Sequence, residues 1–180
     1  LFRSSTSPSA QEQVLGEVVE QEAQDLLSFE LEESEIDPEL PPRIFDSPYR
    51  LIIPKIGVDM EIIPNEKNEK LALKRGGWLI PGTADPTNAN GYNNMVIAAH
   101  RYQYTSGPNT FFDLDLLENG DEVIIEWEEQ IFRYLIEKSE VVEPSEVSVL
   151  AKTSQPQLTL FTCTPKFTTK QRLIVTAKPI

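Results

Sequence analysis

The sequence has few residues that could form covalent or metal cross-links. Its 180 residues include one Cys and one His. A single Cys cannot form an intramolecular disulfide, so the Cys count leaves the compartment undecided between the cytosol and the exterior. No apolar run approaches the roughly 20 residues of a membrane-spanning helix, and no hydrophobic core of a signal peptide is visible. The chain begins at Leu1 rather than Met, and we expect an N-terminal segment to precede it.

Basic residues are also scarce, with 16 Lys and Arg against 29 Asp and Glu. Residues 1–46 carry 12 acidic and 2 basic side chains, a net charge of −10, whereas residues 47–180 carry 17 and 14, a net charge of −3. No basic stripe is available for phosphate, and the acidic N-terminal part would be repelled by it. We therefore expect no nucleic-acid partner, and anionic lipid headgroups are disfavoured for the same reason.

The acidic part reads as a tail. Apolar residues recur at spacings near 3.6 in "VLGEVVEQEAQDLLSFEL", which predicts an amphipathic helix over residues 14–31. Four prolines between Pro38 and Pro48 would end that helix and impose an extended connector. We therefore expect a tail or linker at residues 1–47 and one globular domain at residues 48–180.

The globular part has the pattern of an all-β domain. Strands are predicted at "NMVIAAH", "DEVIIEW", "QIFRYLIEKSEVV", "LTLFTC" and "RLIVTAK", with two more within residues 49–63. Only short helical turns fit between them, near "FFDLDLLENG" and "PSEVSVL". Many strands, few helices and no βαβ alternation predict an all-β barrel or sandwich.

Three residues could carry chemistry together. His100 and Cys163 each end a predicted strand, and taken alone such residues are more often structural. With Arg172, however, they would supply a thiolate, an imidazole that moves protons and a donor for a developing oxyanion. Cys163 and Arg172 flank an eight-residue stretch, "TPKFTTKQ", so they should lie side by side on antiparallel strands. The sequence does not show how His100 reaches them.

Several stretches resemble one family. "LTLFTCTP" followed by "QRLIV" resembles the TLxTC and RL signature of the sortases, cysteine transpeptidases that attach proteins to Gram-positive cell walls or polymerise pili. "NMVIAAHRYQYTSGPNTFFDLDLLENGDEVII" is similar to the family's histidine segment, and "YRLIIPKIGVDMEII" to its first strands. The resemblance covers about residues 49–178. The short spacing from Cys to Arg and the "CTP" sequence are more similar to sortase classes C to F than to class A.

The resemblance implies a closed eight-stranded β-barrel with the active site at one end. Cys163 would attack an LPxTG-like sorting signal after Thr and form a thioacyl enzyme. His100 would protonate the leaving amine and deprotonate the incoming one, while Arg172 would steady the oxyanion. With reference pKa values of about 8.5 for Cys and 6.5 for His, roughly one pair in a hundred is thiolate–imidazolium, so turnover should be slow.

The partners follow from the same resemblance. They are a surface-protein sorting-signal peptide and an amine acceptor, either a peptidoglycan precursor or a pilin lysine. We expect no cofactor and a monomer. The resemblance implies an extracytoplasmic enzyme that touches the membrane only through an anchor upstream of Leu1.

Four neighbouring residues are weaker candidates for substrate binding. Ala99 and Thr162 match positions that line the family's substrate groove, although as isolated residues they are ordinary strand residues. Thr164 and Pro165 open the loop of residues 164–171, which should border the site. Its alternative interpretation is a plain hairpin connection.

The connector before the barrel, with Asp37, Pro38 and Asp46, could cross the active-site mouth as a lid that brings Asp37 or Asp46 near Arg172. Class C pilin sortases carry a lid with an Asp-Pro-aromatic motif, whereas here Glu39 follows Pro38. The alternative is a spacer between membrane and barrel.

A metal site is not expected. Asp113, Asp115, Asp121 and Glu122 are close in sequence, but they lack EF-hand spacing, and scattered surface acids are usually solvated.

Other classes of protein fit the motifs less well. An L,D-transpeptidase normally has Arg within two residues of its Cys, where this chain has Thr164 and Pro165. A papain-like protease has its Cys before its His, whereas His100 precedes Cys163. The alternative from a different class is a non-catalytic extracellular β-barrel binding or adhesion module with a buried structural Cys, which predicts an inert thiol.

Overall fold

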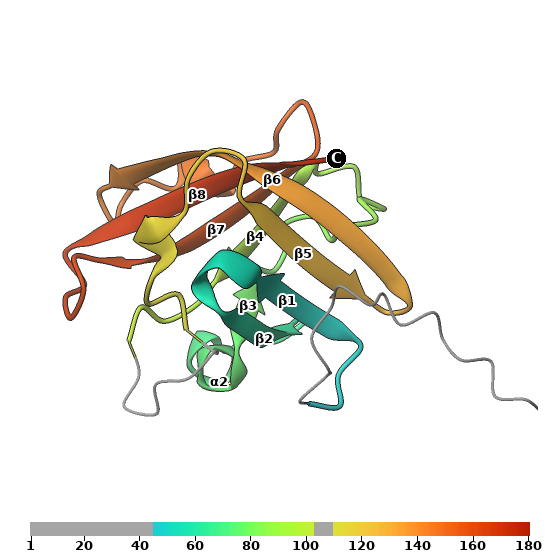
Figure 1. The fold of residues 1–180 in the computed structure, drawn as a ribbon, viewed down its shortest axis with the longest axis horizontal. Helices are drawn as coiled ribbons and strands as arrows, with labels where there is room; N and C mark the ends of the chain where they lie inside the picture. Colours follow the sequence, from blue (N-terminus) through green and yellow to red (C-terminus); the bar gives the residue numbers. More distant parts are fainter. Residues whose placement is uncertain (1–44, 103–109) are drawn as a thin grey trace, which may run out of the picture. The chain divides into compact units, whose positions relative to one another are not determined.

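Eight strands run through residues 45–102 and 110–180, the part of the chain that the computed structural model describes (Figure 1). They are β1 (Tyr49–Ile53), β2 (Val58–Ile63), β3 (Gly77–Leu79), β4 (Asn94–Ala98), β5 (Glu122–Trp127), β6 (Gln130–Val142), β7 (Gln157–Thr164) and β8 (Gln171–Pro179). The described helices are α2 (Glu69–Arg75) and the 3-10 turns η1 (Pro54–Ile56), η2 (Leu114–Leu116) and η3 (Ser148–Leu150). The predicted helix over residues 14–31 lies outside the described residues.

The strands close into one barrel in the order β1-β2-β3-β4-β7-β8-β6-β5, and β5 pairs back onto β1. The pairs β2–β3 and β4–β7 are parallel, and the other pairs are antiparallel. Closure leaves no unpaired sheet edge, which a flat sheet of this size would expose. The predicted closed eight-stranded barrel is confirmed.

Alternation of side chains explains why these strands close around a core. Successive residues of a strand point to opposite faces, so every second residue can face inward. The inward set is apolar and buried: Leu51, Ile53, Val58, Met60, Ile62, Met95, Ile97, Ala99, Val123, Ile125, Leu158, Leu160, Leu173, Val175 and Ala177. The residues between them therefore point to the outer face of the barrel.

Two elements between β2 and β4 are absent from the sequence-based prediction. Helix α2 is seven residues long, and the side chain of Asn68 caps it by accepting a hydrogen bond from the Leu71 backbone N–H at 3.3 Å. Strand β3 has only three residues. Its approach to β2 needs Gly76, because a Cβ there would lie 2.2 Å from the backbone oxygen of Glu61. No helix in the described residues is long and apolar enough to cross a membrane.

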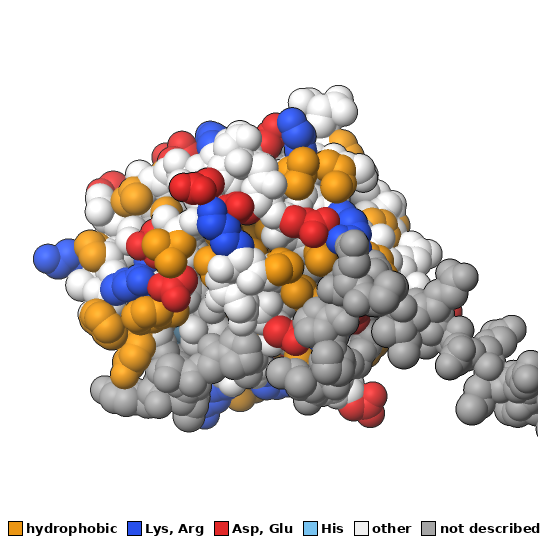
Figure 2. Space-filling view, in the orientation of Figure 1, with side chains coloured by type: hydrophobic (Ala, Val, Ile, Leu, Met, Phe, Trp, Pro, Cys, Tyr) orange, Lys and Arg blue, Asp and Glu red, His pale blue; other side chains and the backbone are white. Residues whose placement is uncertain are grey.

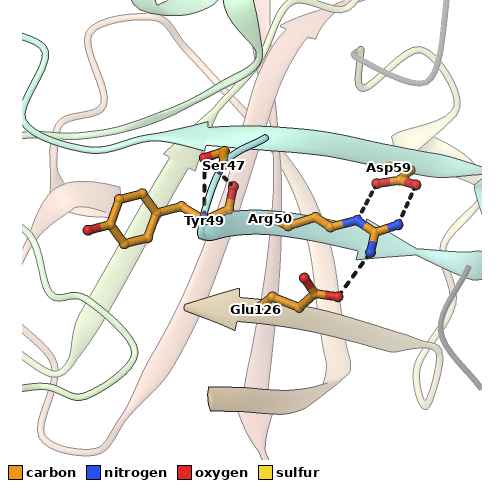
Figure 3. Close-up of polar contacts among 5 residues, drawn as sticks. All are labelled: Ser47, Tyr49, Arg50, Asp59 and Glu126. Carbon is orange, nitrogen blue, oxygen red and sulfur yellow. Dashed lines mark hydrogen bonds and ion pairs between the residues drawn. The ribbon is translucent and has the colours of Figure 1, made fainter. Parts of the chain in front are cut away.

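A buried ion cluster joins β1, β2 and β5 on the outer face of the barrel (Figure 3). Arg50, 1% exposed, donates from Nε and Nη2 to the two carboxylate oxygens of Asp59, both at 2.7 Å, and from Nη1 to Glu126 at 3.0 Å. The hydrogen bond to Asp59 raises the pKa of Arg50 above its ordinary value. This bidentate arrangement keeps a buried cation paired, as burial of charge requires.

Candidate active site

Cys163 and Arg172 are direct neighbours across the β7–β8 ladder. They are register partners near the carboxyl end of β7 and the amino end of β8, as the eight-residue loop between these strands predicts. Cys163 is a free cysteine with a partly exposed side chain. The thiol is therefore available to solvent at the end of its strand and is not a fully buried core residue.

His100 reaches the pair through the parallel pairing of β4 with β7. Ala98 is the register partner of Phe161, and the pairing continues with a 3.3 Å hydrogen bond from the Ala99 N–H to the Phe161 carbonyl. β4 ends at Ala98, and the same register continued for two residues puts His100 on the side of β7 that carries Cys163. The sequence could not show this step, because β4 and β7 are separated by two strands and their loops.

Side-chain alternation places all three residues on the same face. Ala99 and Leu173 face inward, and so do residues at every second position of these strands. His100, Cys163 and Arg172 each occupy the outward position next to an inward one. The result is one row across three adjacent strands, with Cys163 in the middle, on the outer face near one end of the barrel.

The guanidinium of Arg172 is oriented by the loop that precedes it. Nη1 donates to the backbone carbonyls of Thr169 and Gln171, both at 3.1 Å. Among the described residues, these contacts use Nη1 alone. Nε and Nη2 therefore carry N–H groups that can donate to a bound carbonyl or oxyanion.

Ala99 and Thr162 do not share the outward row. They are 5% and 2% exposed, and the Thr162 hydroxyl donates to the Ala99 carbonyl at 2.8 Å. Both side chains lie on the inner side, where they pack and tie β4 to β7. The prediction that they line the substrate groove stays a prediction.

The loop after Cys163 forms a tight turn. Pro165 is exposed, and its carbonyl accepts from the Thr168 N–H at 3.1 Å and from the Thr168 hydroxyl at 3.0 Å. Thr164 is half-buried and pairs with Gln171 across the ladder. This loop lies directly beside the row that contains Cys163, as expected, so Thr164 and Pro165 stay candidates for substrate contact.

The predicted lid residues fall in two places. Asp37 and Pro38 lie outside the described residues. Asp46 is exposed and leads into the start of β1. The strand directions put the start of β1 at the end of the barrel opposite the carboxyl ends of β4 and β7, and β1 is four strands from β7 around the closed ring. The structure therefore does not bring Asp46 near Arg172.

The four acidic residues considered for a metal form ion pairs in the structure. Asp113 and Asp115 pair with Lys166, Asp121 with Lys55, and Glu122 with Arg133. Within residues 45–102 and 110–180, no group of three or more His, Cys, Asp and Glu side chains could hold a metal ion. The sequence suggested that these acids are simply solvated, whereas in the structure each one forms an ion pair with a Lys or Arg.

Sequence reasoning missed the charged residues that surround the row. Arg101 directly follows His100 and is 4% exposed, and its Nη2 donates to Asp115 at 2.5 Å. Lys166, three residues after Cys163, donates to Asp113 at 2.7 Å. The available signal was the "HR" sequence at a strand end, since a charge next to a buried strand needs a partner.

Comparison with known proteins identifies the class of this barrel. The family model of the sortase domain matches residues 51–180. Sortase SrtE1 of Streptomyces coelicolor is 33% identical over 144 residues, which cover 72% of this chain but only 39% of that protein. The chain therefore belongs to the sortase family, and it spans well under half the length of this curated relative.

Solved structures of pilus-type sortases are similar as well. Sortase C1 of GBS Pilus Island 1 is 30% identical with a TM-score of 0.64, covering 73% of this chain and 63% of that one. Sortase C2 of the Group B Streptococcus Pilus Island 1 is 26% identical with a TM-score of 0.66, covering 77% and 76%. Streptococcus pneumoniae sortase C is 27% identical with a TM-score of 0.64, covering 73% and 65%. The expected likeness to class C over class A is confirmed.

Proposed function

We propose that this chain is the catalytic domain of a cysteine transpeptidase. It cleaves an LPxTG-like sorting signal after Thr through a thioacyl enzyme and transfers the acyl group to an amine. The observation that carries the proposal is the outward row of His100, Cys163 and Arg172 on three neighbouring strands. Membership of the sortase family supports the reaction class.

The first half of the reaction makes the thioester. The Cys163 thiolate attacks the Thr carbonyl carbon, and the electron pair of the C=O bond moves to oxygen. Arg172 donates from Nε or Nη2 to this oxyanion, because Nη1 is already engaged by the loop carbonyls. The oxyanion then collapses, the C–N bond breaks, and the imidazolium of His100 gives its proton to the departing amine.

The second half reverses the proton flow. The neutral imidazole of His100 accepts a proton from the incoming amine as the amine nitrogen attacks the thioester carbon. The C–S bond breaks, Cys163 leaves as thiolate, and the new amide bond completes the transfer. Water in place of the amine gives hydrolysis. Open access to the outer face suits both large substrates, since neither has to enter the barrel.

The partners are proposed from the family. The acyl donor is a surface-protein sorting-signal peptide, and the acceptor is the amine of a peptidoglycan precursor or a pilin lysine. The description of the pneumococcal sortase C names pilin substrates for that protein, which makes a pilin lysine one amine to test. We further propose that the protein is monomeric, that it works outside the cytoplasm, and that an anchor upstream of Leu1 holds it at the membrane.

The non-catalytic alternative depends on a buried, inert Cys163. The thiol is instead partly exposed, and Arg172 is its register partner on β8. No observation in the described residues favours the binding-module interpretation over catalysis.

The deciding experiment is mass spectrometry of the protein after incubation with a small library of LPxTG-type peptides, with and without triglycine. We expect a thioacyl adduct on Cys163 without the amine and a triglycine-linked product with it. Cys163→Ala should give neither species, because it lacks the nucleophile.

Two further variants assign the other roles. His100→Ala should block adduct formation, and Arg172→Ala should slow it by about 100-fold to 1,000-fold, the usual effect of losing one oxyanion donor. Arg172→Lys is the matched control, because it keeps the positive charge and removes only the planar guanidinium that donates hydrogen bonds in a fork. An adduct that forms equally in wild type and Cys163→Ala, or no adduct with any peptide, would sink the proposal.

A further inference from the structure

The segment of residues 110–116 contacts the chain immediately after His100 in two ways. The Phe111 N–H donates to the His100 carbonyl at 2.9 Å, and Phe111 is fully buried in the core. The next side chain, Arg101, donates from Nη2 to Asp115 at 2.5 Å. The backbone of His100 and the side chain of Arg101 are therefore both bonded to this segment.

The same segment also contacts the chain immediately after Cys163. The Lys166 ammonium lies 2.7 Å from Asp113, 3.8 Å from Asp115 and 4.2 Å from the ring centroid of Phe112. Phe167 stacks edge-on against Phe112 with ring centroids 6.0 Å apart. In Figure 2, apolar groups with basic and acidic groups beside them gather at the left edge, where Figure 1 shows the β7–β8 loop and η2.

Asp115 is the point at which the two sets of contacts meet. It is the carboxylate that contacts both Arg101 and Lys166. Arg101 is 4% exposed, and its Nε and Nη1 have no hydrogen-bond partner among the described residues. Asp115 is thus the partner in the described part of the chain that keeps this buried cation in place, and its loss would leave the charge uncompensated.

We propose that Asp115 is a positioning residue for the transpeptidase reaction: through Arg101 and Lys166 it sets the spacing between the imidazole of His100 and the thiol of Cys163. The inference rests on the proposed function. β4 and β7 fix this spacing as far as Ala99, whose N–H bonds the Phe161 carbonyl and whose carbonyl accepts from the Thr162 hydroxyl. Beyond these bonds, the residues that follow His100 and Cys163 are held together through Asp115. Proton transfer depends steeply on such a distance, because a misplacement of about 1 Å can cost about 100-fold in rate.

The test compares Asp115→Asn with Asp113→Asn. Both variants replace a carboxylate by an amide on the same short segment and remove a contact with Lys166, but only Asp115→Asn strands Arg101. The readouts are the single-turnover rate of thioacyl-adduct formation and the peptide concentration that gives half of that rate. For Asp115→Asn we expect a rate about 100-fold lower with an unchanged half-saturating concentration. Asp113→Asn should keep most of the rate, and Asp115→Glu should recover most of it.

The double variant Arg101→Met with Asp115→Asn separates positioning from folding. It removes the stranded cation along with its partner, so the melting temperature should return toward that of wild type while the rate stays low. A rate that recovers together with the melting temperature would show a merely structural role and overturn the inference. Equal losses in Asp115→Asn and Asp113→Asn would overturn it as well.

The two proposals fail in distinguishable ways. If the wild-type protein forms no adduct, the proposed function fails, and this inference fails with it. If wild type forms the adduct and Asp115→Asn forms it at the same rate, only the positioning role of Asp115 is wrong.

Discussion

Two arginines are buried in the described part of the chain, Arg50 in β1 and Arg101 three residues after the end of β4, and they are paired very differently. Arg50 uses all three guanidinium nitrogens, in a bidentate contact with Asp59 and a third bond to Glu126 (Figure 3). Among the described residues, Arg101 bonds through one nitrogen, Nη2, to Asp115, whose side chain is 46% exposed. The first cluster lies on the far side of the ring from β7, and the second adjoins the row proposed to be catalytic.

The contrast separates a cluster that stabilises the fold from a contact that costs stability. A fully paired cation fixes three strands in one geometry, and nothing in that geometry has to change during a reaction. A cation held by one exposed carboxylate costs stability that better pairing would recover. Such under-satisfied groups gather at functional sites, where placement matters more than stability.

The largest expected effect comes from breaking the Arg50 cluster. Arg50→Met removes the buried cation that pairs with Asp59 and Glu126. The free energy of unfolding should fall by about 3–5 kcal/mol. Urea denaturation followed by Trp fluorescence measures this loss, and the adduct-forming rate per folded molecule should stay at the wild-type level.

The matched control for that prediction removes the whole cluster. A triple variant with Arg50→Met, Asp59→Leu and Glu126→Leu should recover much of the lost stability, because apolar groups can replace a buried ion cluster. If Arg50→Met instead slowed catalysis per folded molecule, the two arginines would not have separate roles.

A second prediction concerns how the free energy of unfolding depends on pH through Tyr134 in the barrel interior. Burial of the Tyr134 ring, 4% exposed, raises the pKa of its hydroxyl to about 12. Between pH 10 and 12 the unfolded chain releases this proton and the folded chain keeps it. The free energy of unfolding should therefore fall by about 1.4 kcal/mol per pH unit in that window.

Tyr134→Phe isolates this contribution, since the difference between wild type and variant cancels the titration of the lysines. Equal slopes for the two proteins would show that Tyr134 is not buried as described.

The smallest expected change in stability is that of Lys166→Met. The Lys166 side chain is 30% exposed and its partners Asp113 and Asp115 are 40% and 46% exposed. Ion pairs this exposed contribute less than about 1 kcal/mol. The free energy of unfolding should hardly change while adduct formation slows, and a loss above about 2 kcal/mol would mean that these contacts stabilise the fold as much as the Arg50 cluster does.

The strands were predictable because their apolar residues alternate or run continuously, as at β4, β5, β7 and β8. Helix α2 and strand β3 were missed, since seven and three residues carry too little periodicity to read. Their placement depends on Gly76 allowing close approach to the β2 backbone, which is a tertiary contact. The signal for barrel closure came from the family resemblance and not from the strand pattern.

The site was predictable in its chemistry but only partly in its geometry. The neighbouring positions of Cys163 and Arg172 follow from a short loop, whereas the position of His100 requires the parallel β4–β7 pairing. The structure buries the side chains of Ala99 and Thr162, which the sequence alone did not indicate, and their role in substrate binding stays a prediction. Asp115 was read as a solvated acid, since its partner Arg101 is 14 positions away along the chain.

The outward row has a consequence for directed evolution of this barrel. Since His100, Cys163 and Arg172 share the outer face, positions that reshape substrate choice can be randomised without opening the interior. A library confined to exposed loop positions such as Pro165 and Phe167 should yield mostly folded clones. The inward neighbours Leu160 and Leu173 belong in a separate library selected for heat resistance. Loop positions beside the proposed site and core positions of the adjoining strands can thus be mutated separately, the first for substrate choice and the second for stability.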